Sequence, residues 1–200
     1  MLEIRWHGRG GQGLKTAAEA LAQTAFLEGN FVTAFPFYGP EREGAAITAF
    51  TRIDGAKIRL RCGVYEPDLV VVTDESLLGS KGQEIVEGLK EDGTLIVNTT
   101  ASPAQIRAKI GFQGKIVTIP ATKIAQDLGI KYAYVPILGA VAKILGLSLP
   151  SARKGLNKKL LELKLAPKAR ERNLKGLKRG YKIKPQRSIK RRWMRWARRG

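Results

Sequence analysis

A glycine-rich run, Gly8-Arg9-Gly10-Gly11-Gln12-Gly13, constrains the fold of this 200-residue chain more than any other feature. It lies between an apolar strand candidate at residues 2–6 and a helical pattern at residues 14–28. Glycine permits tight turns and close backbone approach, and the amides and dipole of a helix N-terminus attract anions. The run predicts a strand–loop–helix unit, and its loop has two interpretations: a phosphate-binding site or a plain turn.

The middle of the chain alternates apolar runs with helical patterns. Residues 69–72, 95–97 and 116–119 have the continuous apolar character of strands buried on both faces. Residues 47–53 and 57–61 flank Asp54-Gly55 and predict an antiparallel hairpin. We therefore expect an α/β fold with a mostly parallel, mixed sheet. The expected helices cover residues 82–90, 103–109, 122–128, 136–147 and 150–165.

The formal charge of +19 is concentrated near the C-terminus. Residues 151–200 contain 20 lysines and arginines and 2 acidic residues, whereas residues 1–150 contain 16 and 15. We expect a nearly neutral domain over residues 1–166 and a basic, flexible C-terminal extension over residues 167–200, where glycines and a proline interrupt the helical pattern. Such an extension is expected to bind an acidic partner or nucleic acid. Residues 189–199 mix tryptophan with arginine, a composition typical of a segment that folds when it binds such a partner.

Composition also bounds the chemistry and the compartment. The single cysteine, Cys62, excludes a disulfide framework and any cysteine-ligated zinc or iron–sulfur site built by this chain alone. No apolar stretch reaches the roughly 18 residues of a membrane helix, and the first residues enter a strand pattern instead of a signal-peptide layout. We therefore expect a cytoplasmic protein without membrane contact.

Three segments, at residues 4–13, at 37–45 with 50–53, and at 65–71, occur together in this order. Together they resemble the gamma subunits, or gamma domains, of 2-oxoacid:ferredoxin oxidoreductases, in particular the pyruvate and 2-ketoisovalerate enzymes. Residues 138–143 are similar to a fourth segment of that family. The resemblance covers about the first 150 residues, a domain-sized stretch, and stops before the basic extension.

The resemblance implies a Rossmann-like three-layer domain inside a multi-subunit enzyme that converts a 2-oxoacid, coenzyme A and oxidised ferredoxin to an acyl-CoA, CO2 and reduced ferredoxin. It implies coenzyme A at this subunit, and thiamine diphosphate, Mg and iron–sulfur clusters on alpha, beta and delta-type subunits. The coenzyme A phosphates would lie at Gly8, Arg9, Gly10, Gly11, Gln12 and Gly13. From the residues alone a different function stays open: a nucleotide-binding module tethered to nucleic acid by its basic extension.

Several side chains have both a functional and a structural interpretation. Gln12 suits either a ligand contact or a brace within the loop. Asn98 and Thr99 follow a predicted parallel strand, where open α/β sheets bind ligands, or they cap the turn there. For His7, the only histidine, we expect a structural role, and we expect Cys62 to be buried and not catalytic. The aromatic and charged residues 37–43 suit a subunit contact or a solvated turn.

Overall fold

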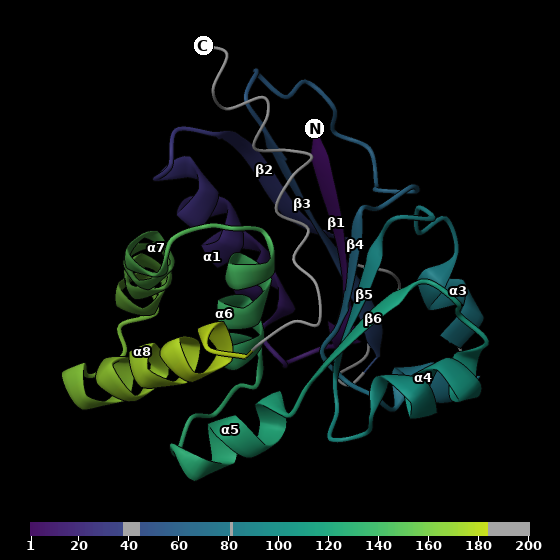
Figure 1. The fold of residues 1–200 in the computed structure, drawn as a ribbon. Coiled ribbons are helices and arrows are strands. Elements are labelled where there is room, and N and C mark those ends of the chain that lie inside the picture. Colours follow the sequence, from purple (N-terminus) through teal and green to yellow (C-terminus); the bar gives the residue numbers. More distant parts are fainter. Residues whose placement is uncertain (38–44, 81, 184–200) are drawn as a thin grey trace.

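A computed structural model describes residues 1–37, 45–80 and 82–183 of the chain. A six-stranded sheet in the order β2-β3-β1-β4-β5-β6 lies between two layers of helices (Figure 1). β1, β4, β5 and β6 are parallel, whereas β3 runs antiparallel to both β1 and β2. The expected α/β fold with a mixed, mostly parallel sheet is confirmed. The strands are β1 (Leu2–Arg9), β2 (Phe31–Phe37), β3 (Ala46–Asp54), β4 (Leu69–Val72), β5 (Thr94–Asn98) and β6 (Lys115–Ile119).

Each face of the sheet is covered by its own helical layer and its own apolar core. Because strand side chains alternate, Val71 of β4 joins the core under one layer while Val70 and Val72 join the other. The first layer contains α1 (Leu14–Phe26), α5 (Ala121–Asp127), α6 (Tyr134–Ile144), α7 (Leu149–Glu162) and α8 (Pro167–Tyr181). The second contains α2 (Leu77–Ser80), α3 (Gly82–Val86) and α4 (Pro103–Ile110). None of the described helices is long and apolar enough to cross a membrane.

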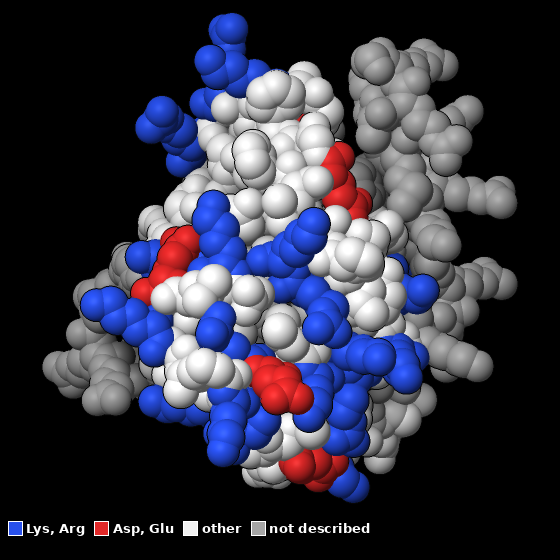
Figure 2. Space-filling view, turned by 90° about the vertical axis from the view of Figure 1, so that its left-hand side faces the viewer, with Lys and Arg blue, Asp and Glu red and all other residues white. Residues whose placement is uncertain are grey.

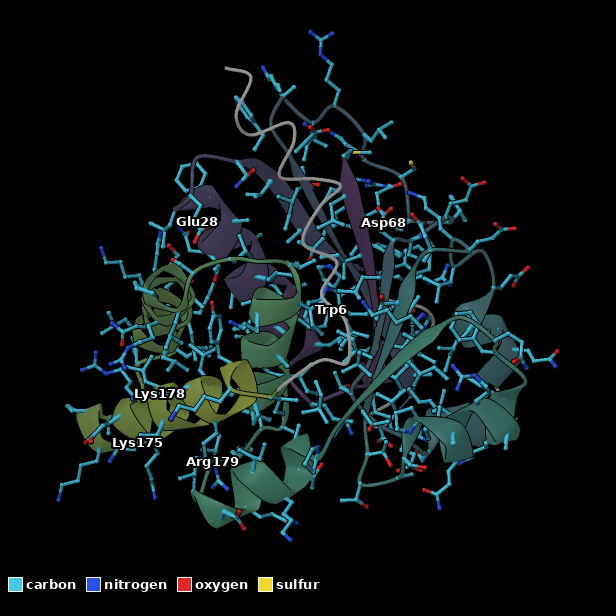
Figure 3. All side chains as sticks on the ribbon, in the orientation of Figure 1. Trp6, Glu28, Asp68, Lys175, Lys178 and Arg179 are labelled. Carbon is cyan, nitrogen blue, oxygen red and sulfur yellow. The ribbon has the colours of Figure 1, made fainter. Side chains whose placement is uncertain are left out.

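Local signals fix several of these boundaries. The Ser102 side chain accepts a hydrogen bond from the Gln105 amide, and the Gln105 side chain accepts one from the Ser102 amide, which makes a capping box at the start of α4. Gly111 ends that helix in the left-handed conformation. Farther along, the Glu28 carboxylate accepts a hydrogen bond of 2.7 Å from the amide of Ser148, the N-cap of α7. This bond ties the end of α1 to the start of α7, and Figure 3 shows Glu28 beside both.

The hairpin predicted around Asp54-Gly55 is wrong. β3 pairs instead with β2, opposite Phe31, and with β1, and residues 57–61 form no strand. Arg52 explains the difference, because its buried guanidinium donates hydrogen bonds of 2.8 Å to the carbonyls of Cys62 and Gly63. These bonds hold the segment after β3 over a face of the sheet and away from its edge.

A second buried arginine holds the same segment. Arg5 donates to the carbonyls of Val64 and Tyr65. It also donates to the carbonyls of Ile85, in α3, and of Glu87, just after that helix. Burial lowers the pKa of Arg5, opposed in part by the charge of Glu87. Carbonyl oxygens thus satisfy a guanidinium that would be costly to bury alone.

The side chain of Cys62 is exposed, so the expectation that it would be buried is wrong.

The first part of the segment expected to be flexible forms α8, which packs on α6. Gly176 and Gly180, which suggested helix interruption, are buried on the side of α8 that faces α6. A Cβ on Gly180 would lie 2.6 Å from the carbonyl carbon of Pro136, and one on Gly139 would overlap the carbonyl of Leu177. The glycines therefore permit the two helix backbones to touch, and this contact orders the segment. The rest of the basic extension, residues 184–200, lies outside the described residues.

Candidate functional site

A cavity of about 630 Å³ opens where the carboxyl ends of β1, β4, β5 and β6 meet at one edge of the sheet. From this edge the chain continues through α1 into one helical layer and through α2 and α3 into the other (Figure 1). Ligands of open α/β sheets bind at such a switch point. The described lining consists of Gly11, Gln12, Thr73, Asp74, Glu75, Asn98, Thr99, Thr100, Pro120, Thr122, Lys123, Ala125, Gln126, Ile130, Lys131, Tyr132, Ala133 and Tyr134.

The glycine run forms the turn from β1 into α1 at this edge. Gly11 and Gly13 have φ values of 83° and 78°, in the left-handed region that favours glycine. A Cβ on Gly13 would lie 2.7 Å from the Tyr134 ring, whereas one on Gly11 would meet no described atom within 4 Å. Gly13 is the N-cap of α1, and no described side chain caps that helix. The first-turn amides therefore remain available to water or to a ligand.

Gln12 braces the loop. Its side-chain oxygen accepts a hydrogen bond of 3.0 Å from the Arg9 amide, and its side-chain nitrogen donates one of 2.8 Å to Asp74. Arg9 also contacts Asp74, at 3.2 Å, and donates to the Ser76 hydroxyl at 2.8 Å. Partial burial raises the pKa of Asp74, but hydrogen bonds from Ser76 and Gln12 and the Arg9 charge outweigh burial and hold it below its ordinary value. The charge of Arg9 is thus balanced by Asp74, which follows β4.

Asn98 and Thr99 hold the neighbouring strand ends together. The Asn98 side chain donates hydrogen bonds of 2.9 Å to the Thr73 carbonyl and the Thr122 hydroxyl, and accepts one of 3.1 Å from the Thr122 amide. Thr99 accepts a bond of 2.9 Å from the amide of Ala101 through its hydroxyl and thereby shapes the following turn. Thr99 thus caps the turn after β5, whereas Asn98 links the end of β4 to the start of α5.

The structure brings half of the expected site residues to the cavity. Gly8 and Gly10 have structural roles in the loop instead. A Cβ on Gly8 would overlap the Thr73 hydroxyl, and the Gly10 amide donates a hydrogen bond of 2.9 Å to the Ala45 carbonyl. Gly11, Gln12, Asn98 and Thr99 line the cavity, whereas Gly8, Arg9, Gly10 and Gly13 lie outside its described lining.

Among the lining residues that the sequence did not predict are Lys123, Lys131 and Tyr132. The Lys131 ammonium lies 5.0 Å from the centre of the Tyr132 ring, and that ring lies 5.8 Å from the Tyr134 ring. Burial, with a smaller contribution from Tyr132, raises the pKa of Tyr134, which stays protonated. Neither lysine forms an ion pair with a described residue. Their position after a predicted parallel strand, residues 116–119, is the signal that could have found them.

The environment of His7 fits the structural role expected for it. Arg5 donates a hydrogen bond of 3.1 Å to the His7 ring, and the His7 carbonyl accepts one of 2.8 Å from the Thr73 amide. Burial, with a smaller contribution from Arg5, lowers the pKa of His7 to about 3, so the ring is neutral near pH 7. Within the described ranges, no group of three or more His, Cys, Asp or Glu side chains could hold a metal ion.

Residues 3–183 match the family model described as pyruvate ferredoxin/flavodoxin oxidoreductase. The chain belongs to this family. It is 52% identical over 149 residues to the pyruvate/ketoisovalerate oxidoreductases common subunit gamma of Pyrococcus abyssi, covering 74% of this chain and 80% of that protein. It is 44% identical over 180 residues to the pyruvate synthase subunit PorC of Thermotoga maritima, covering 90% and 92%.

Solved structures place this family member in the same fold. The crystal structure of the pyruvate oxidoreductase subunit PORC from Thermotoga maritima has a TM-score of 0.75 at 41% identity and covers 90% of this chain and 94% of that one. A 2-oxoglutarate:ferredoxin oxidoreductase from Magnetococcus marinus, solved with 2-oxoglutarate, coenzyme A and succinyl-CoA bound, has a TM-score of 0.75 at 18% identity. That likeness concerns the fold, and it covers 95% of this chain but 32% of the longer one.

Proposed function

We propose that this chain is the gamma subunit of a pyruvate or 2-ketoisovalerate:ferredoxin oxidoreductase and that it binds coenzyme A for the complex. Family membership and the names of the Pyrococcus and Thermotoga relatives support the first part. The complex would also need alpha, beta and delta-type subunits, with ferredoxin as electron acceptor. We assign the iron–sulfur clusters to those subunits, because one cysteine cannot supply the four thiolates of an ordinary cluster. We assign thiamine diphosphate and Mg to them on the family resemblance.

The coenzyme A proposal is carried by one observation: Lys123 and Lys131, which form no ion pair with a described residue, line the cavity together with Gly11 and Gln12 of the turn that leads into the uncapped start of α1. Coenzyme A carries a pyrophosphate and a 3′-phosphate, and both amide groups at a helix start and ammonium groups bind phosphate. Lys123 and Lys131 would supply the positive charge first expected from Arg9, whose charge is balanced by Asp74. The subunit would bind and orient coenzyme A, and no described residue is assigned a chemical step.

Removal of both lysines tests the electrostatic part of this proposal. A charge-assisted hydrogen bond contributes about 1.5 to 3 kcal/mol, so Lys123→Ala with Lys131→Ala should weaken coenzyme A binding at least tenfold. Isothermal titration of the purified complex would measure it, with Lys109→Ala on α4, in the opposite layer, as the control. Dephospho-coenzyme A, which lacks the 3′-phosphate, would show which phosphate the lysines hold. Unchanged coenzyme A affinity in the double variant would exclude this cavity.

A glycine substitution tests the loop separately. Gly11→Val places a branched side chain at the cavity and should block the approach of a phosphate to the backbone. Gly29→Val is a matched control, because Gly29 has the same left-handed conformation, with φ 82°, and equally open surroundings, but lies in the turn after α1. We expect both folded variants to lose similar stability and only Gly11→Val to lose coenzyme A affinity. Equal affinity in the two variants would contradict the loop assignment.

The nucleic-acid module left open by the sequence is not supported by these comparisons, because the oxidoreductase family model spans residues 3–183. The cytoplasmic location remains part of the proposal. The unpaired, exposed thiol of Cys62 is typical of a reducing compartment.

A further inference from the structure

The exposed surface of α7, α8 and the turn between them, here called the basic helical face, is strongly positive. Between residues 149 and 182 the chain has twelve lysines and arginines and only two acidic residues. Both acidic side chains already contact lysines: Glu162 contacts Lys159 at 2.7 Å and Glu171 contacts Lys175 at 2.8 Å. Figure 2 shows blue side chains crowded over the lower part of this face. A large excess of positive charge therefore meets the solvent here.

This charge is held in a fixed arrangement. α8 turns Gly176, Leu177 and Gly180 toward α6, so Lys175 and Lys178 must lie on its outer side, where both are exposed. Figure 3 shows Lys175, Lys178 and Arg179 along that helix. Arg179 additionally contacts Asp127 of α5 at 3.2 Å, which ties the face to the helix beside the cavity. Because the packed helix fixes the positions from which these charges project, they favour a defined partner surface over nonspecific attraction.

Two exposed leucines distinguish a protein partner from nucleic acid. Leu161 and Leu163, at the junction of α7 and α8, are each 51% exposed among these cations. Apolar side chains surrounded by charged ones are typical of protein interfaces. Nucleic acid instead requires phosphate contacts and, for single strands, aromatic rings for stacking. Between residues 149 and 182 no aromatic side chain is exposed.

We propose that the basic helical face docks an acidic surface of a companion chain in the oxidoreductase complex. A second copy of this chain is a poor partner, because it would bring the same positive surface into contact with itself. The 17 residues after Ile183 contain further lysines and arginines and no acidic residue, so they add to the positive charge of the chain. The inference rests on the proposed subunit role and goes beyond the coenzyme A site.

Carbodiimide cross-linking of the native complex gives a residue-level test. This reagent joins lysines to aspartates or glutamates in direct contact, and mass spectrometry identifies the pairs. We expect Lys168, Lys175 or Lys178 to be linked to carboxylates of a companion chain. Links to companions only through Lys57 or Lys109, both exposed but outside the basic helical face, would overturn the proposal.

Charge reversal tests the energetic role of the face. Lys168→Glu with Lys178→Glu changes the charge by the same amount as the control pair Lys57→Glu with Lys109→Glu, and all four lysines are exposed. We expect the first pair to weaken affinity for the purified companion chains at least tenfold in 100 mM NaCl, and the control pair less than twofold. Equal losses in the two variants, or none in the first pair, would refute docking at this face.

Two further measurements separate the alternatives. Leu161→Ser should also weaken the affinity for companion chains, although it changes no charge. If charge reversal instead lowered only the binding of a 20-nucleotide RNA and Leu161→Ser changed nothing, the face would be a nucleic-acid site and the proposal would fall. Coenzyme A affinity of the charge-reversed chain should stay unchanged, so a failure of the coenzyme A proposal would be seen independently.

Discussion

The contact between α6 and α8 leads to the sharpest stability prediction, for Gly180→Ala. An alanine Cβ there would lie 2.6 Å from the carbonyl carbon and 2.8 Å from the Cα of Pro136, whereas ordinary contacts begin near 3.4 Å. The obstacle is backbone and cannot rotate away, so α8 must move outward by roughly 1 Å, which loosens the packing of the fully buried Leu177. Overpacking of this kind costs about 1 to 3 kcal/mol.

Alanine also favours helix over glycine by about 1 kcal/mol, which offsets part of that cost. Since backbone contacts place the cost at the upper end, we expect a net loss of about 2 kcal/mol. For a domain of this size the melting temperature would fall by about 4 to 8 °C. Urea unfolding would measure the free energy of unfolding through the fluorescence of tryptophan, including the fully buried Trp6. Calorimetry would measure the melting temperature.

Gly79→Ala is the matched control, because Gly79 is also helical but a Cβ there would meet no described atom within 4 Å. We expect this variant to be as stable as the native chain or slightly more stable. If Gly180→Ala behaved like Gly79→Ala, α8 would not be packed on α6, and the C-terminal helix would be the flexible segment that the sequence suggested.

Three further predictions concern the sheet and its loop. Asn98→Ala should lower the free energy of unfolding by about 2 to 4 kcal/mol in urea titrations, because it leaves the Thr73 carbonyl and the Thr122 amide without their bonds. Gly13→Ala should destabilise the chain more than Gly29→Ala, since both strain a left-handed backbone but only the first meets the Tyr134 ring. The pKa of His7 is about 3 in the folded chain and about 6.5 in the unfolded chain, so the free energy of unfolding should fall as pH drops below about 6.5. His7→Gln should reduce this pH dependence, which unfolding curves at pH 7 and pH 5 would measure.

The sequence was sufficient for the fold wherever periodicity and burial act together. Residues 69–72 were predicted as a strand and form β4, because a short, continuous apolar run can be satisfied only between two layers. Prediction from sequence failed where a contact between residues far apart in the chain determines the local structure. Arg52 binds the carbonyls after β3 and removes the expected hairpin, and Gly139 on α6 makes room for the α8 backbone at Leu177 and Tyr181. Neither partner is adjacent in sequence, so local patterns could not reveal it.

The candidate site was predictable in place but not in detail. The glycine run and Asn98 both lie at the carboxyl edge, because parallel strands bring their ends together. The sequence did not show which side chains would balance charge within the protein and which would line the cavity. Asp74 lies more than sixty residues from Arg9 in the chain, yet it balances the charge that was expected to face a phosphate. Lys123 and Lys131 carry no motif, and only the path of the chain after β6 brings them to the cavity.

The brace formed by Gln12 has a thermodynamic consequence for any anion that binds here. Since its amide joins the Arg9 backbone to Asp74, the turn is held in shape before a ligand arrives. Ordering a loop on binding would subtract from the affinity, and a turn that is already fixed avoids that loss. A phosphate-bearing ligand of the proposed kind would therefore be selected by its fit to a turn whose shape is set before it arrives.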